Sequence, residues 1–438
     1  MDLCLPCLDP PLLPTEEEEG GGGHLSPSSV ILDTTAYISA DAVSNTTTAA
    51  GWMTNGAPIQ VSLCLARPPR LSYLCVHFPG PVLGPDCPLV VGTHADLALL
   101  WVAIPGSPVV KDHSTFDYFV YTTRPHPGAS DLRRLPKPTK GFRDQDAAIV
   151  RCSGSRYVIA VLRNTLDPLE FTLELYDSGT QRWTSRLLRV QEPQRDRVLP
   201  IPDSATELGF HRTTKTIALG PTTPARCNRG YFCRGGSSGH RDITVIKLPD
   251  QSHLIKYQVH HSSSDDDDDS SGGGGGDYVR DYWTATIWTM PVPIASWKDC
   301  TIDAGNMVID NPRHRELLLA LPGLTVDPQE AAAVTLSRLV TSHPTLGLGL
   351  GLDGHVTVYF LTKVYCNARE GWIIVVGTKD NKLQGIARLD ERKNFSFRRH
   401  YRPTEISKYL TKAYNFFFIY AMLLITLYSG NMYLSTCM

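Results

Sequence analysis

Short apolar runs that alternate with polar positions dominate the chain from Val30 onward, and helical periodicity is nearly absent. Pro, Gly and Asn clusters separate the runs, as is typical of strands joined by turns. The first runs are SVILDTTAYI, IQVSLCLA, LSYLCVHF, LALLWVAI and DYFVYTT. This spacing predicts an all-β fold.

The clearest unit lies between Ala147 and Val190 and contains four such runs, AAIVRC, RYVIAVLRN, FTLELYDS and RWTSRLLRV. Four strands within about 40 to 50 residues are typical of one antiparallel blade of a repeat protein. Tyr176 ends the third run, and Asp177, Ser178 and Gly179 follow as a hairpin turn in which we expect Gly179 to adopt positive φ. Trp183 opens the fourth run, and we expect it to pack between neighbouring blades.

Weaker copies of this unit follow later in the chain, with Trp288, Trp297 and Trp372 as their large aromatic residues. The run after Trp372 contains a turn at Asp380 and Asn381. We therefore predict a propeller-like body of antiparallel β-repeats with few short helices. The segment 327–340, DPQEAAAVTLSRLV, suits a helix at its start and a strand at its end, and the pattern leaves both alternatives open.

Composition divides the chain into three parts. Residues 1–28 combine prolines with runs of glutamate and glycine, which predicts a disordered acidic leader. Residues 29–410 form the predicted β-repeat body, interrupted by a low-complexity insertion at 260–277 that contains five aspartates in a row and a glycine run. Residues 411–438 form a hydrophobic tail.

The tail contains an almost wholly apolar run, Phe416 to Tyr428, preceded by Lys408 and Lys412. This run is shorter than the roughly 20 residues that span a bilayer. Two interpretations stay open: a membrane tail anchor through residues 414–434, or a buried or interfacial terminal segment.

The net charge of −2 provides no positive field for nucleic acid, so we expect no nucleic-acid partner. The 11 cysteines are scattered and odd in number, which favours reduced thiols over a secreted disulfide framework. The N-terminus lacks the charge and apolar core of a signal peptide. These features predict a cytoplasmic or nuclear protein, with a tail-anchored membrane protein as the alternative.

Two glycine-rich motifs resemble catalytic or cofactor signatures. GLGLDG (349–354) fits the letters of a dinucleotide loop, but a strand-like run follows it where a helix is required. GGSSG (235–239) fits a nucleophile elbow around Ser237, with His240 and Asp242 nearby, but it also precedes a strand-like run. We therefore predict no catalytic residue and no cofactor.

The other polar motifs favour no ligand. CLPC (4–7) has half of a zinc-knuckle spacing without a second half, and the remaining candidates, Cys227, Cys233, His260 and His261, lie in polar segments that do not preorganise a metal site. NFSFRRHYRP (394–403) interleaves aromatic residues and arginines as base-stacking surfaces do, but its alternation favours a closing strand. We predict no metal site.

Several segments, taken in order, resemble a grass-abundant plant family known as domain of unknown function 1618. They cover most of residues 29–410 and are VILDTTAYI, IQVSLCLARPPRLSYLCVHFPG, LELYDSGTQRW, WTATIWTM, WKDCTIDAGNMVIDNPRH, HPTLGL, VTVYFLTKV and WIIVVGTKDNKLQGIARLDERKNFSFRRHYRPTEISKYL. The family is similar to kelch-type and F-box-associated β-repeat proteins, which implies a propeller-like body and brings no catalytic residues. The segment 220–247 departs from the family pattern, which puts one blade in doubt, and the tail after Leu410 lies outside the resemblance.

These patterns together favour a non-catalytic module that binds another protein, because repeated blades concentrate variable loops on one face. Two alternatives remain. One is an enzyme whose active-site residues are dispersed in the sequence and meet in a central channel. The other is a membrane-tethered form of the interaction module.

Overall fold

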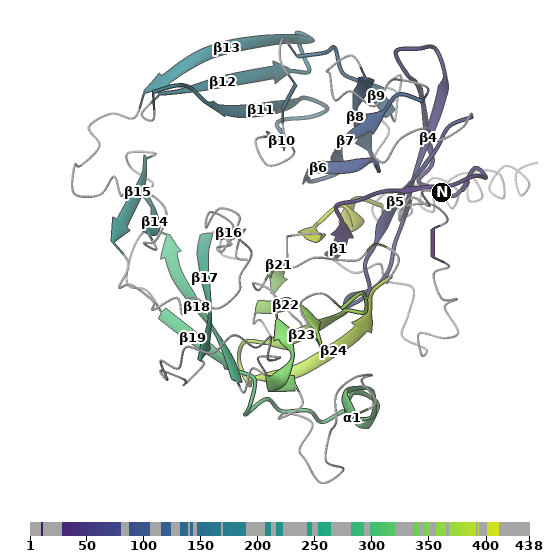
Figure 1. Ribbon diagram of the computed structural model, residues 1–438. Coiled ribbons are helices and arrows are strands. Elements are labelled where there is room, and N and C mark those ends of the chain that lie inside the picture. Colours follow the sequence, from purple (N-terminus) through teal and green to yellow (C-terminus); the bar gives the residue numbers. More distant parts are fainter. Residues whose placement is uncertain are drawn as a thin grey trace, which may run out of the picture. The chain divides into compact units, whose positions relative to one another are not determined.

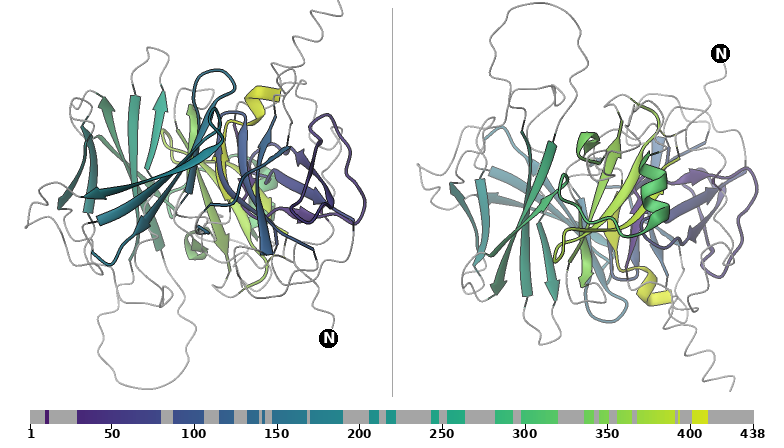
Figure 2. Two further views of the ribbon diagram at one scale, coloured as in Figure 1. Left: turned by 90° about the horizontal axis from the view of Figure 1, so that it is seen from above. Right: turned by 90° about the horizontal axis from the view of Figure 1, so that it is seen from below.

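A computed structural model describes the chain in segments, and strands dominate them (Figure 1). The described residues are 10–11, 29–79, 87–105, 115–123, 132–138, 141–142, 147–167, 170–189, 206–211, 216–221, 243–247, 253–263, 282–292, 298–319, 336–341, 345–350, 356–364, 368–390, 393 and 401–410. Within the described residues, helix is confined to α1 (Pro312–Leu319), visible in green in the right view of Figure 2, and to short turns at 336–338 and 407–410. The predicted all-β class is confirmed.

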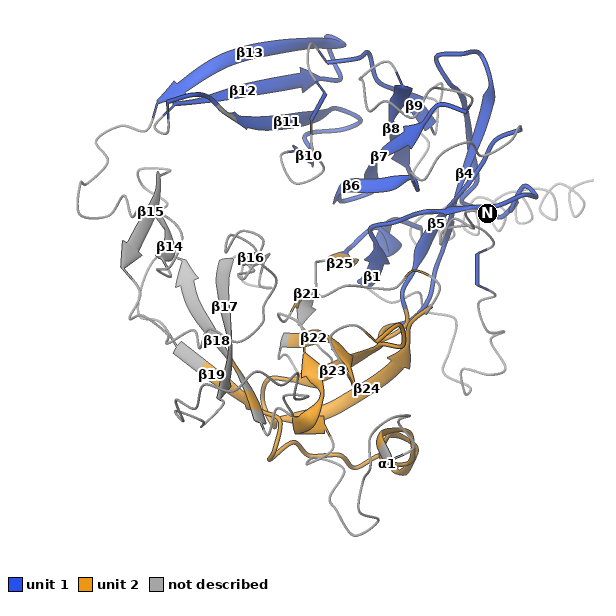
Figure 3. Ribbon diagram, viewed as in Figure 1, with its two compact units in different colours: residues 1–67, 71–189, 404–438 blue, residues 68–70, 190–403 orange. Residues whose placement is uncertain are grey.

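The chain divides into two compact units (Figure 3). The first comprises residues 1–67, 71–189 and 404–438, and the second comprises residues 68–70 and 190–403.

Three four-stranded sheets follow one another in the first unit. The first sheet has the order β2-β5-β4-β3, and the second and third have the orders β6-β7-β8-β9 and β10-β11-β12-β13. Their strands, with β1 before them, are β1 (Val30–Asp33), β2 (Tyr37–Ile38), β3 (Ala49–Trp52), β4 (Pro58–Cys64), β5 (Tyr73–His77), β6 (Leu89–His94), β7 (Leu97–Ala103), β8 (Phe116–Thr122), β9 (Leu132–Arg134), β10 (Ala147–Arg151), β11 (Tyr157–Asn164), β12 (Glu170–Asp177) and β13 (Arg182–Arg189).

The third sheet is the four-stranded antiparallel unit that the sequence predicts between Ala147 and Val190. Its last hairpin pairs Tyr176 with Trp183 and Asp177 with Arg182. The turn between them differs from expectation in one respect. Gly179 does not adopt positive φ; Gln181 does, with φ of 55°. The left-handed residue is therefore the last one of the four-residue turn, directly before β13.

Gly179 is favoured for a different reason. A Cβ atom there would lie 3.2 Å from the Asp177 carboxylate and 3.5 Å from Arg156 Nε. Because the first distance is tighter than most Cβ contacts in proteins, any larger residue would push against the ion pair of these two side chains.

The second unit contains one two-stranded sheet, β14-β15, and two larger sheets, β16-β17-β18-β19 and β20-β22-β23-β24, with β21 also pairing with β22. The strands are β14 (Thr206–His211), β15 (Thr216–Pro221), β16 (Ile243–Lys247), β17 (His253–Ser263), β18 (Tyr282–Val292), β19 (Lys298–Asp303), β20 (Val340–Thr341), β21 (Thr345–Leu350), β22 (Val356–Lys363), β23 (Trp372–Gly377) and β24 (Lys382–Arg388). The final described strand is β25 (Tyr401–Thr404).

Three predicted segments can be compared with these strands. β17 continues to Ser263 and pairs with β18 there, so the strand occupies the first four residues of the predicted insertion at 260–277. GLGLDG begins inside β21, which pairs antiparallel with β22, so its flanks are strands. In the ambiguous segment, residues 336–338 are helical and β20 begins at Val340.

Two hydrophobic cores lie between consecutive sheets of the first unit. Alternation along β7 sends Ala98, Leu100 and Val102 to the core shared with the first sheet, and Leu97 and Leu99 to the core shared with the third. The second sheet is therefore covered on both faces. In the second unit one core joins the β16–β19 and β20–β24 sheets, with Trp283 and Phe360 in contact at 5.0 Å between ring centroids.

Several predictions lie outside the described residues. They concern most of the leader and the insertion after Ser263, CLPC, GGSSG, Cys227 and Cys233, Trp297, residues 394–400 and the tail 411–438. Among the helices of the described segments, none is long and apolar enough to cross a membrane.

Candidate functional site: a polar cluster between two sheets

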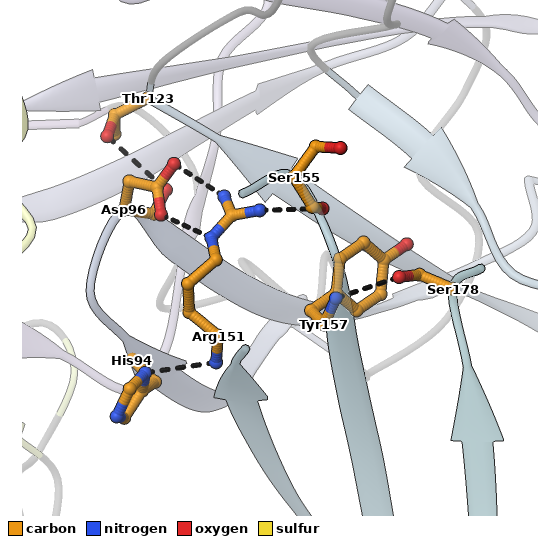
Figure 4. Close-up of polar contacts among 7 residues, drawn as sticks. All are labelled: His94, Asp96, Thr123, Arg151, Ser155, Tyr157 and Ser178. Carbon is orange, nitrogen blue, oxygen red and sulfur yellow. Dashed lines mark hydrogen bonds and ion pairs between the residues drawn. The ribbon is translucent and has the colours of Figure 1, made fainter. Parts of the chain in front are cut away.

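A set of polar contacts in the first unit lies where turns of the second and third sheets meet (Figure 4). His94 ends β6 and Asp96 follows in the two-residue turn to β7. Ala95 has φ of 55° in this turn. Arg151 ends β10, so the two sheet ends bring a carboxylate and a guanidinium together.

The Asp96 carboxylate and the Arg151 guanidinium form a bidentate ion pair. Arg151 Nε donates to Asp96 Oδ1 at 2.7 Å, and Arg151 Nη2 donates to Oδ2 at 2.5 Å. The two side chains are only 11% and 6% exposed. Arg151 Nη1 donates to the Ser155 carbonyl at 2.9 Å, so the guanidinium is bonded on both sides. A buried pair with this geometry fixes the relative position of the two sheets.

Neighbouring groups complete the hydrogen bonding around this pair. The Arg151 backbone N–H donates to His94 Nδ1 at 3.0 Å, which requires the unprotonated form of that nitrogen. The Thr123 backbone N–H donates to the Asp96 carbonyl at 2.9 Å, and the Thr123 hydroxyl donates to it at 3.3 Å. The end of β8 is therefore tied to the same turn.

Tyr157, at the start of β11, borders the cluster with a buried side chain. Its backbone N–H donates to Ser178 Oγ at 2.8 Å, whereas its hydroxyl is buried without a hydrogen-bond partner. Burial, followed by the neighbouring Tyr176, raises the pKa of Tyr157 to about 12. The phenol therefore stays neutral across the physiological range.

This arrangement favours a mechanical role. Both Asp96 oxygens accept from Arg151, so the carboxylate is held as the partner of a cation and is not placed to remove a proton from a substrate. A nucleophile paired with a base does not occur among the seven side chains of Figure 4. In the described part of the chain, no group of three or more His, Cys, Asp or Glu side chains could hold a metal ion.

Two similar polar links join other consecutive sheets. Within the first unit, the Asp117 carboxylate on β8 accepts from the Thr54 backbone N–H at 2.7 Å and from the Thr54 hydroxyl at 2.5 Å. Within the second unit, the Asn381 side chain accepts from the Asp303 N–H at 3.1 Å and donates to the Asp303 carbonyl at 2.7 Å. Each link joins a turn of one sheet to a strand of its neighbour.

The four residues that the sequence analysis singled out in the third sheet, Tyr176, Asp177, Gly179 and Trp183, lie in or beside one hairpin. Trp183 lies 5.3 Å from Tyr176 and 6.3 Å from Phe142 between ring centroids, and its Nε1 donates to the Pro136 carbonyl at 2.9 Å. Pro136 follows β9 of the second sheet, so Trp183 contacts both sheets.

Asp177 organises the turn. Its Oδ1 accepts from the Gly179 N–H at 2.8 Å, and the carboxylate pairs with Arg156 at 2.5 Å. The Arg156 guanidinium, followed by the Gly179 N–H, holds the pKa of Asp177 below its usual value.

The remaining marked tryptophans lie in the second unit. Trp372 begins β23 and is buried in the core of that unit. Trp288 lies within β18, opposite Tyr257 of β17. Trp297 is outside the described residues.

Sequence reasoning missed Asp96, Arg151 and Asp117. The only signal for Asp96 was its place between two apolar runs in VGTHADLALL, which indicates a turn and not a partner. Arg151 and Asp117 lie inside strand patterns, where neighbours in sequence do not reveal a contact with a different sheet.

The cysteines require one correction. Cys64, Cys75, Cys152 and Cys300 carry reduced thiols, as expected, but Cys87 is disulfide-bonded. The preference for reduced thiols over a disulfide framework therefore has an exception at Cys87 among the described cysteines.

No family model matches the sequence, and no curated protein matches it.

Proposed function

We propose that this chain is a non-catalytic protein-interaction module built on a propeller-like scaffold of β-repeats, as in the family of domain of unknown function 1618. Sheets of four or five strands, each formed by neighbouring segments of the chain and antiparallel except for the β2–β5 pair, support the scaffold. The ordered motifs of the sequence support the family. The fully paired Asp96–Arg151 link supports a role in holding sheets together and not in chemistry.

The observation that carries the interaction role is the open edge of β13. This strand is the last of its sheet, and within the described residues no further strand pairs with its outer edge. All its side chains except Trp183 are exposed. An unpaired edge of eight residues presents backbone donors and acceptors to which an extended peptide can add as another strand.

The side chains of β13 define the chemistry of the partner. Leu187 and Leu188 are 56% and 41% exposed, so the edge presents apolar side chains to solvent. Arg189 pairs with Glu170, whereas Arg182 and Arg186 make no ion pair in the described part of the chain. An extended segment that carries carboxylates and apolar residues complements this edge, because it pairs the two arginines and covers the leucines.

The experiment is affinity capture with the full chain and two charge-reversal variants. Arg182→Glu with Arg186→Glu alters the edge, and Arg313→Glu with Arg369→Glu changes the net charge equally at exposed arginines of the second unit. We expect one protein to be retained by the wild type and the control variant and lost, by tenfold or more, from the edge variant. The binding segment of that protein is then mapped and its carboxylates replaced by lysine.

Recovery of binding between the edge variant and the lysine-substituted segment supports direct pairing at β13. Equal capture by all three chains, or a captured segment without carboxylates, contradicts the proposal.

A further inference from the structure

Two cysteines share one face of the first sheet. β4 pairs antiparallel with β5 so that Ser62 lies opposite Cys75 and Cys64 lies opposite Tyr73. Because side chains alternate along a strand, Cys64 and Cys75 project from the same face as diagonal neighbours. The opposite face carries Val61, Leu63 and Leu74, which belong to the main core.

The two thiols lie in a small cluster of their own. Tyr37, Tyr73 and Cys75 are buried together, and Cys64 and Val43 pack against them. The rings of Tyr37 and Tyr73 meet edge to face at 5.0 Å between centroids. The Tyr73 hydroxyl donates to the Pro11 carbonyl at 2.6 Å, which fixes its position beside the thiols.

The two thiols differ in accessibility. Cys75 is 3% exposed, whereas Cys64 is partly exposed at the end of β4. A small oxidant therefore reaches Cys64 first. Hydrogen bonding with Cys75, opposed by burial and aided by Tyr73, lowers the pKa of Cys64, which increases the thiolate fraction.

The other two reduced cysteines provide a contrast. Cys152 is exposed and its Sγ lies 4.0 Å from the Val150 carbonyl. The Cys300 thiol donates to the Thr378 carbonyl at 2.7 Å. Neither has a cysteine among its described contacts.

We propose that Cys64 and Cys75 are a peroxide-oxidisable thiol pair that closes a reversible disulfide between β4 and β5. The Cys64 thiolate attacks one oxygen of hydrogen peroxide, which breaks the O–O bond and gives a sulfenic acid on Cys64 and, after proton uptake, one water. The Cys75 thiol attacks that sulfur, the S–S bond forms, and the sulfenic oxygen leaves as a second water. Two thiols supply the two electrons that reduce one peroxide to two waters.

The geometry makes this bond attainable and reversible. Diagonal neighbours on an antiparallel pair lie about 7–8 Å apart between Cα atoms. A disulfide spans up to roughly 6.8 Å, so a small shift of one strand closes the bond. A bond formed with such a shift is readily reduced by a dithiol.

The test is quantitative mass spectrometry of the full chain after graded hydrogen peroxide and alkylation. The digest is chosen to cut on both sides of Cys75, so that Cys87 falls in a different peptide. We expect a peptide linked through Cys64 and Cys75 to appear at lower peroxide than oxidation of Cys152, and to disappear on treatment with dithiothreitol.

Three variants sharpen the result. In Cys75→Ser, the Cys64 sulfenic acid has no resolving thiol and accumulates as a dimedone adduct. In Cys64→Ser, Cys75 stays reduced, and in Cys152→Ser the linked peptide forms as in the wild type. The proposal is overturned if Cys152 oxidises while Cys64 and Cys75 stay reduced, or if Cys64 links to a different cysteine.

Discussion

The β12–β13 hairpin of the first unit and the β23–β24 hairpin of the second are built on the same turn. In each, four residues connect the strands, and the last of the four has positive φ, 55° at Gln181 and 50° at Asn381. The register is also equivalent: one pair further from the turn, Tyr176 lies opposite Trp183 and Val376 lies opposite Leu383.

The two hairpins differ in what happens beyond their last strand. Beside β24, the Val308 N–H donates to the Asn381 carbonyl and the Leu383 N–H donates to the Val308 carbonyl, both at 2.9 Å. Gly385 of β24 also lies against Pro69, which is 3.0 Å from where a Cβ would be. Beside β13, by contrast, no strand of the described residues pairs with the outer edge, and the Trp183 indole donates to the Pro136 carbonyl. Within the described residues, the outer edge of β13 is therefore open, whereas chain segments lie against β24.

The comparison shows that the same turn forms with different side chains at its start, while neighbouring chain segments set the burial. Asp177 accepts from the turn amide of Gly179, and Gly377 has no side chain to do so, yet both turns close in the same way. Every residue of β23 is buried, whereas β13 is almost wholly exposed. An open edge on an otherwise repeated unit is where we expect a partner.

The largest effect is expected from Asp96→Ala. It leaves the buried Arg151 guanidinium without a counter-ion, and we expect the free energy of unfolding of the first unit to fall by about 3–5 kcal/mol. Urea unfolding followed by hydrogen exchange of peptides from β6 to β13 measures this. Replacing both partners, as Asp96→Ala with Arg151→Met, recovers part of the loss; a fall of less than about 1 kcal/mol for Asp96→Ala contradicts the role of the link.

The next prediction compares two leucines on the last strands of the two hairpins, Leu383 on β24 and Leu187 on β13. Leu383→Ala removes a side chain that is 2% exposed and costs about 2–4 kcal/mol. Leu187→Ala removes one that is 56% exposed and changes stability by less than about 0.5 kcal/mol. The same unfolding measurement on each variant compares the edges, and equal losses would show that β13 is covered.

Glycine substitution at the two positive-φ turn residues gives smaller changes in stability, which we expect to have opposite signs in the two hairpins. Gln181→Gly relieves positive φ at an exposed position and raises stability by about 0.5 kcal/mol. Asn381→Gly relieves the same strain but removes two hydrogen bonds with Asp303, so we expect a net loss of about 1–2 kcal/mol. Thermal unfolding of both variants tests the sign, and stabilisation by Asn381→Gly would contradict the link.

The smallest expected effect is a loss of stability of the β12–β13 hairpin at acidic pH. The pKa of Asp177 is lower in the folded chain than in the unfolded chain, so the carboxylate stabilises the fold above its unfolded pKa and loses this contribution as the pH falls through the folded value. Exchange rates of β12–β13 amides should therefore rise below about pH 4 in the wild type, relative to their intrinsic rates. In Asp177→Asn this acid-dependent rise should be absent, and an identical rise in both chains would assign it to other groups.

The sequence predicted the strands better than their partners. Alternation and the run DSGTQRW identified the β10–β13 sheet and its hairpin, because those signals act between neighbours in sequence. Positive φ was assigned to Gly179 and occurs at Gln181, because position in the turn outweighs the preference of glycine. The Asp96–Arg151 pair joins residues 55 positions apart, which no local pattern of the sequence encodes. The open edge of β13 depends on the lack of a neighbouring strand among the described residues, and the pattern of β13 itself does not encode that either.

Residue-level hydrogen exchange of the isolated chain tests the open edge most directly. We predict that the β13 amides pointing away from β12 exchange at nearly the rate of an unstructured peptide, while the Leu383 amide of β24 is strongly protected by the Val308 carbonyl. Uniform slow exchange along β13, equal to that of β24, would contradict the account.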